Sequence, residues 1–120
     1  MKVAVTSQGP DLTSEVDPRF GRASCFIVFD SRTGRFTMHD NTQNLNADQG
    51  VGIQAARNVA DLEVEAVVTG NVGSKAFSVL QKANVKVYLG AKGSVTDVFE
   101  QFQRGQLASA REPNVEGHWM

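Results

Sequence analysis

The sequence AVVTGNVGS at residues 66–74 joins an apolar run to a glycine-rich turn. Residues 66–69 show no alternation of apolar and polar side chains, which is typical of a strand covered on both faces of a sheet. The turn leads directly into residues 75–83, which we expect to form a helix. The same unit follows once more, with a predicted strand at residues 85–89 and a predicted helix capped by Ser94. Two consecutive strand–helix units predict parallel strands with helices packed on the sheet.

The part of the chain before these units supplies the remaining predicted elements. Residues 2–7 are predicted to form a buried strand, and residues 25–30 and 35–40 to form two shorter strands joined by a tight turn at residues 31–34. Residues 51–62 carry apolar side chains at helical spacing. The predicted order is therefore βββαβαβα. With right-handed crossovers, this order corresponds to a mixed five-stranded sheet in a three-layer α/β/α sandwich.

Length and charge narrow the possible functions. A chain of 120 residues has the size of one domain, which we place at residues 1–107. The polar residues 108–120 are predicted to form a flexible tail, in which His118 is a candidate metal ligand. The formal net charge of −1 gives no general attraction to nucleic acid or to an anionic membrane surface. Because the apolar start is too short for a signal peptide or a membrane span, we expect a cytoplasmic protein that binds neither nucleic acid nor membranes.

The single cysteine, Cys25, limits the metal and redox chemistry of the chain. It excludes an intramolecular disulfide and every Cys-x-x-Cys site, so protein thiolates cannot hold a conventional iron–sulfur cluster. No paired acids and no Ser/His/Asp or Cys/His set can be placed for catalysis. The G-x-G-x-x-A pattern at residues 50–55 follows a polar loop instead of a strand, and residues 70–75 lack the P-loop spacing. We therefore expect a protein that is not an enzyme.

Four loops are predicted to meet at the carboxyl edge of the sheet, where open α/β sheets bind ligands. They comprise residues 9–24, 41–50, 70–74 and 90–94, and three of them lead into helices. Helix N-termini present unpaired N–H groups and a positive dipole end, and glycines allow a ligand to approach the backbone, so the expected guest is an anion. The candidate binding residues are Arg19, Gly21, Arg22, Gly50, Gly70, Asn71, Gly73, Ser74 and Lys92, with Lys75 beside them.

The same residues also have a plainer explanation. Glycines are common at strand-to-helix turns because such turns are tight. Arg19 and Arg22 can pair with Asp17 or Glu15 and so order the loop without binding any ligand. Cys25 begins an apolar strand and is more typical of a packed residue than of a ligand. The sequence leaves the structural and the ligand-binding explanation open.

Several separate motifs, in order, resemble the dinitrogenase iron–molybdenum cofactor biosynthesis family. They are residues 1–8, EVDPRFGRA at 15–23, residues 41–52, TGNVG at 69–73 and VYLG at 87–90. The resemblance covers about residues 1–107. It implies a ribonuclease-H-like α/β fold and non-enzymatic binding of an iron–molybdenum cofactor or its precursor. Some members of the family carry a molybdenum–copper sulfide cluster, and this chain resembles that branch most.

The candidate anion-binding residues and the family resemblance both indicate a protein that binds a ligand without catalysis. A preassembled metal–sulfide cluster is a bulky anion already saturated with sulfide, so a positive, glycine-lined cradle is enough to hold it. We therefore expect a noncovalent carrier for a molybdenum-containing cluster, either of the iron–molybdenum or of the molybdenum–copper type, with a protein that donates or receives it. The alternative is a regulatory or scaffold domain that uses the same edge for a small anion or a partner protein and never binds a cluster.

Overall fold

The computed structural model describes residues 1–41 and 51–113 of the chain. The elements occur in the predicted order, and their bounds are β1 Lys2–Ser7, β2 Cys25–Asp30, β3 Arg35–Asp40, α1 Val51–Asp61, β4 Ala66–Val68, α2 Ser74–Lys82, β5 Lys86–Tyr88 and α3 Val95–Gln103. Each bound lies within one residue of the prediction where the two differ, which is the usual uncertainty at element ends. The tight turn between β2 and β3 is closed by Gly34 at a φ of +73°.

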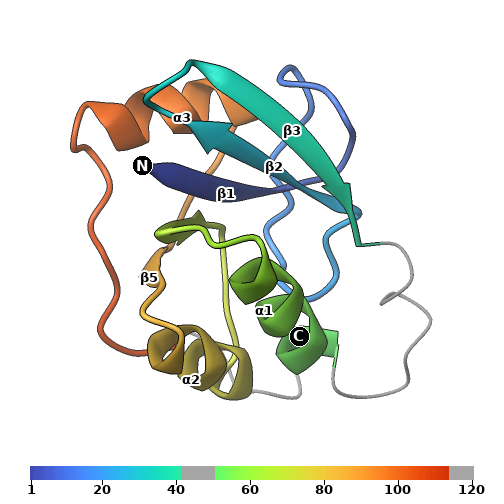
Figure 1. Cartoon of the computed structure of the whole chain (residues 1–120), viewed down its shortest axis with the longest axis vertical. Helices are drawn as coiled ribbons and strands as arrows, with labels where there is room; N and C mark the ends of the chain where they lie inside the picture. Colours follow the sequence, from blue (N-terminus) through green and yellow to red (C-terminus); the bar gives the residue numbers. More distant parts are fainter. Residues whose placement is uncertain (42–50, 114–120) are drawn as a thin grey trace.

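The strands form one mixed sheet in the order β3-β2-β1-β4-β5. β1 pairs antiparallel with β2 and parallel with β4, while β2–β3 is antiparallel and β4–β5 parallel. β1, β3, β4 and β5 therefore point the same way, and their carboxyl ends lie at one edge of the sheet (Figure 1). We refer to this edge, with the loops that leave it, as the carboxyl edge.

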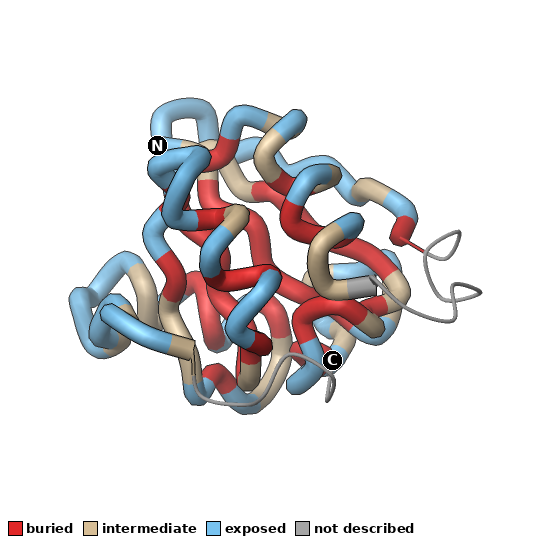
Figure 2. Tube along the Cα trace, turned by 90° about the horizontal axis from the view of Figure 1, so that it is seen from below, coloured by how far each residue is buried: buried red, intermediate tan, exposed pale blue. Residues whose placement is uncertain are grey.

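The sheet is covered on both faces, which confirms the predicted three-layer α/β/α sandwich. Side chains alternate between the two faces along each strand. Ala4 of β1 packs in one buried cluster with the inner faces of α1 and α2, whereas Val3 and Val5 pack in a second cluster with α3. Buried positions accordingly run through the strands and along the inner faces of the helices, with exposed residues outside (Figure 2).

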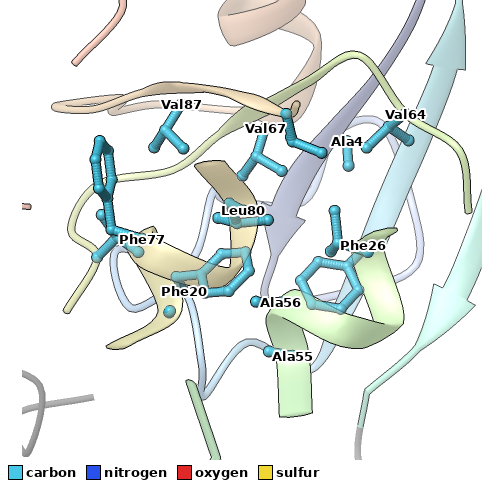
Figure 3. Close-up of a cluster of buried hydrophobic side chains, with 14 of the residues drawn as sticks. Ala4, Phe20, Phe26, Ala55, Ala56, Val64, Val67, Phe77, Leu80 and Val87 are labelled. Carbon is cyan, nitrogen blue, oxygen red and sulfur yellow. The ribbon is translucent and has the colours of Figure 1, made fainter. Parts of the chain in front are cut away.

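The loop between β1 and β2, residues 8–24, contributes to both cores. Val16 is buried in the cluster under α3. Phe20 is fully buried in the cluster of α1 and α2, where Figure 3 shows it beside Ala56 and Leu80. The loop therefore crosses the carboxyl edge from one face of the sheet to the other and is held on both.

The two outer strands of the sheet differ in what lies beside them. Beyond Leu107, where the sequence predicts the tail to begin, Ser109 forms a bridge with Tyr88, and the N–H of Ala110 donates to Val87 O over 2.7 Å. The chain thus continues along β5 as far as these residues. β3, at the other side, carries exposed apolar side chains. In residues 1–41 and 51–113 no helix is long and apolar enough to cross a membrane.

Truncation of Phe20 tests whether the loop is part of the core. We expect Phe20→Ala to lower the free energy of unfolding by about 3–5 kcal/mol, because a fully buried aromatic ring is replaced by a cavity. The control is Phe36→Ala on β3, where the side chain is 44% exposed and the expected loss is below about 1 kcal/mol. Urea unfolding followed by circular dichroism measures both. Equal losses in the two variants would show that the loop does not belong to the core.

Candidate functional site

The loop at residues 8–24 is bonded to the two other described loops of the carboxyl edge. On the α3 side, the N–H of Val16 donates to Gly93 O over 2.9 Å. On the α2 side, the N–H of Phe20 donates to Asn71 O over 3.2 Å, and Arg19 forms a parallel bridge with Asn71. The three loops therefore form one connected surface over the ends of the parallel strands.

Two buried hydroxyl groups fix the point at which the loop crosses the edge. Thr6 Oγ1 lies 2.7 Å from Asp17 O and 2.9 Å from Thr69 Oγ1, and both threonines are fully buried. A hydroxyl donates one proton, so Thr6 donates to the Asp17 carbonyl and Thr69 donates to Thr6. This chain of bonds ties the end of β1, the loop and the end of β4 together.

The glycine-rich turn after β4 packs directly on the loop. A Cβ at Gly70 would lie 2.8 Å from Pro18 Cα, so the turn needs a glycine there for close approach of two backbones. The backbone N–H and the side-chain amide of Asn71 both donate to Pro18 O, over 2.8 Å and 3.0 Å. Gly70 and Asn71, two of the candidate binding residues, therefore have a structural role at this contact.

The two arginines of the loop differ in their surroundings. Asp17 Oδ1 accepts from the Arg19 N–H over 2.9 Å and lies 3.8 Å from Arg19 Nε, which is the loop-ordering pair that the sequence allowed. The Arg19 side chain nevertheless stays 49% exposed, while that of Asp17 is 6% exposed. Arg22 is half-buried, and within the described part of the chain no carboxylate forms an ion pair with it. Both guanidinium groups can therefore serve an anion at the edge.

The N-terminus of α3 is closed to a ligand. Its N-cap residue is Ser94, as predicted, and its first turn contains the carboxylate of Asp97. The first three N–H groups of the helix already have acceptors: those of Val95, Thr96 and Asp97 donate to Ser14 O over 2.9 Å, Leu12 O over 2.9 Å and Ser94 Oγ over 3.1 Å. The expectation that this helix offers free N–H groups to an anion is therefore wrong.

The N-terminus of α2 has the opposite character. Its N-cap is Gly73, which provides no side-chain cap, and its first turn contains no acidic residue. The first N–H groups of a helix have no partner within the helix, and the dipole favours a negative charge beside them. Ser74 and Lys75 are exposed in this turn. Of the two helix starts α2 and α3, α2 is the one whose chemistry suits an anion.

The family model of the dinitrogenase iron-molybdenum cofactor proteins matches residues 1–105. The chain belongs to this family. Among solved structures of similar proteins, the apo form of the orange protein from Desulfovibrio gigas has a TM-score of 0.93 and 39% identity, covering 95% of this chain and 96% of that chain. This similarity confirms the α/β fold that the resemblance implied.

Two further relatives extend the comparison. A Thermotoga protein described as a NifB protein has a TM-score of 0.84 and 34% identity, covering 97% of this chain and 98% of that chain. A protein of uncharacterised function from Methanocaldococcus jannaschii is 28% identical over 109 residues, which is 89% of each chain. These three relatives cover between 89% and 97% of this chain.

The structure brings some of the candidate residues together and separates others. Arg19, Asn71 and Ser74 belong to the connected loops on the α2 side, and Gly73 caps the open helix. Lys92 is exposed but follows Ala91, which is buried in the cluster under α3. Lys92 therefore belongs to the α3 side of the edge, beside the closed helix start.

The remaining candidates either shape the backbone or lie outside the described residues. Gly21 is buried, and its carbonyl accepts from the side-chain amide of Asn41 over 3.4 Å. Gly50 and His118 lie outside residues 1–41 and 51–113. Asn41 is not distinguishable as a site residue from the sequence, because an asparagine at a strand end is ordinary and its partners come together only in the folded chain.

Cys25 is a packed residue at this edge. Its side chain is buried, and the thiol donates to Gly9 O over 3.1 Å, with Ser7 O at 3.9 Å. Burial raises the pKa of the Cys25 thiol above its ordinary value; the hydrogen bond with Ser7 lowers it and the nearby Asp40 carboxylate raises it further. The thiol is therefore neutral at neutral pH and poorly suited to attack a reagent or to bind a metal.

The reactivity of Cys25 follows from this environment. We expect native protein near pH 8 to react with a disulfide reagent at least about tenfold more slowly than unfolded protein, because the thiolate is disfavoured and the sulfur is covered. Since the folded pKa is raised, stability is highest at pH values below the ordinary pKa of the thiol and falls as the pH rises above it. The Cys25→Ala variant should lack that part of the pH dependence. Equal thiol reactivity in native and unfolded protein would contradict the assignment.

Proposed function

We propose that this chain is a non-enzymatic carrier for an anionic, molybdenum-containing metal–sulfide cluster. The cargo is an iron–molybdenum cofactor precursor or a molybdenum–copper sulfide cluster, held noncovalently on the α2 side of the carboxyl edge. Arg19, Arg22 and the start of α2 form the cradle. The proposal includes a cytoplasmic location and a partner protein that donates or receives the cluster.

The contrast between the two helix starts is the observation that carries this proposal. Both follow parallel strands and both are reached by the same loop, yet the loop occupies the N–H groups of α3 and leaves those of α2 without a side-chain cap. The acid in the first turn is at α3, and the exposed Lys75 is at α2. Positive charge and a helix start without a side-chain cap therefore coincide at one place.

A metal–sulfide cluster suits such a place better than a bare metal ion does. Its metals are already bound by sulfide, so the protein has to offer hydrogen-bond donors and positive charge and no new ligands. Arginine is the side chain best matched to a large, weakly hydrated anion. The one thiol of the chain is buried under Gly9 and donates to its carbonyl, which is consistent with a cargo that needs no protein thiolate.

Anaerobic reconstitution tests the carrier proposal. The protein is incubated with tetrathiomolybdate and copper, desalted, and analysed by visible absorption and metal content. We expect molybdenum and copper to stay with the protein in a fixed ratio and to give a charge-transfer band. A parallel incubation with an iron–molybdenum cofactor precursor distinguishes the two cargoes, and retention of that precursor alone would exclude the molybdenum–copper cluster. Loss of both cargoes would contradict the carrier and favour the regulatory alternative, which binding of a plain anion or a partner protein would then support.

Charge reversal on α2 locates the cradle. We expect Lys75→Glu, in the first turn, to weaken retention of the cluster by about ten- to hundredfold, since a charge-assisted contact is replaced by repulsion. An acid in the first turn stabilises a helix, so unfolding does not explain this loss. The matched control is Lys82→Glu in the last turn of the same helix, which should leave retention unchanged. Equal effects of both substitutions would show attraction by overall charge and not a site at the helix start.

A further inference from the structure

Asn41, the residue that follows β3, holds the backbone around Arg22. Its side chain is 1% exposed. The side-chain amide donates to Ala23 O over 2.9 Å and lies 3.4 Å from Gly21 O, while its backbone N–H donates to Ser24 O over 2.9 Å. The two carbonyls bound by the amide belong to the residues immediately before and after Arg22.

The other half of the same side chain has different surroundings. Asn41 Oδ1 is buried, and no donor among residues 1–41 and 51–113 forms a hydrogen bond with it. The orientation of the amide is fixed, because its nitrogen faces two carbonyl acceptors and a flipped oxygen would repel both. An unsatisfied buried acceptor costs stability. The unsatisfied acceptor therefore calls for an explanation beyond the stability of the fold.

We propose that Asn41 is a positioning residue for the anion site, which fixes the backbone on both sides of Arg22 so that the guanidinium is held ready for its guest. This assignment rests on the proposed carrier function. An uncharged amide is the side-chain group that supplies two donors from one nitrogen without adding a charge. It therefore orders the chain beside Arg22 and leaves the positive charge of the arginine uncompensated.

The expected gain comes from preorganisation. Binding an anion through a long side chain requires that the side chain and its backbone become ordered, which weakens binding if they are mobile beforehand. With Asn41 in place, the backbone around Arg22 is already ordered when the protein folds, before any anion binds. Loss of the amide should then weaken anion binding by about three- to tenfold while the fold is retained. The loss should depend on Arg22 being present.

A double-mutant cycle tests this dependence, with tetrathiomolybdate alone as the probe and calorimetry as the measurement. Asn41→Ala is compared in the wild-type protein and in an Arg22→Gln background, and Asn41→Leu, which leaves a smaller cavity, replaces it if the first variant unfolds. We expect the three- to tenfold loss in the wild type and almost none in the Arg22→Gln protein. Equal losses in both backgrounds would overturn the proposal, because Asn41 would then act without Arg22.

The matched control is Asn58→Ala on α1, where Asn58 Oδ1 accepts from Gln54 Nε2 over 3.0 Å. It removes an asparagine and one hydrogen bond at another place, and it should leave anion affinity unchanged.

A second measurement needs no anion and so separates this proposal from the carrier function. Nitrogen-15 relaxation reports the mobility of the Arg22 backbone amide and of its side-chain Nε–H group. We expect both to become more mobile in Asn41→Ala and to stay unchanged in Asn58→Ala. Unchanged mobility in Asn41→Ala would overturn the positioning role even if the wild type binds the probe. If the wild type fails to bind the probe but the mobility rises, the positioning role of Asn41 stands and binding of tetrathiomolybdate beside Arg22 is excluded.

Discussion

The arrangement of the carboxyl edge depends on the loop between β1 and β2 crossing from one face of the sheet to the other. Val16 packs under α3 and Phe20 under α1 and α2, so the chain between them has to pass over the end of β1. The hydroxyl of Thr6 fixes that passage through its bond to Asp17 O. The same path brings Leu12 and Ser14 onto the start of α3, whereas the start of α2 has no side-chain cap.

The fold could be predicted from the sequence because its signals are local. The apolar run at residues 66–68 and the stripe through Val95 and Val98 show their burial within a few neighbouring positions. The path of residues 8–24 could not be predicted, because its bonds join residues far apart in the chain. Thr96 Oγ1 and Leu12 O are separated by 84 positions, and the Asn71 amide and Pro18 O by 53. No periodicity in the loop indicates those partners.

The candidate site was predictable in part, and one missed step was within reach. The sequence predicts Ser94 as a helix cap, and a cap satisfies the very N–H groups that an anion needs. A capped helix start is the poorer anion site, so the cap predicts that an anion binds at α2 and not at α3. Lys92, which lies beside α3, is then not expected to take part in binding. The structural use of Gly70 was not predictable, because it depends on Pro18 lying against it. The role of Asn41 was hidden for the same reason, since Gly21 and Ala23 approach it only after folding.

A carrier has to release its cargo as well as hold it, and the chemistry of this edge suits both. Backbone N–H groups and guanidinium groups bind an anion through contacts that water and salt can replace. A thiolate instead forms a bond to the metal itself, and that bond has to be broken before the cluster can leave. Cys25 lies at the same edge, but burial and its bond to Gly9 O keep the sulfur neutral and covered. The packing that raises the pKa of this thiol therefore also keeps it from binding a metal of the proposed cargo.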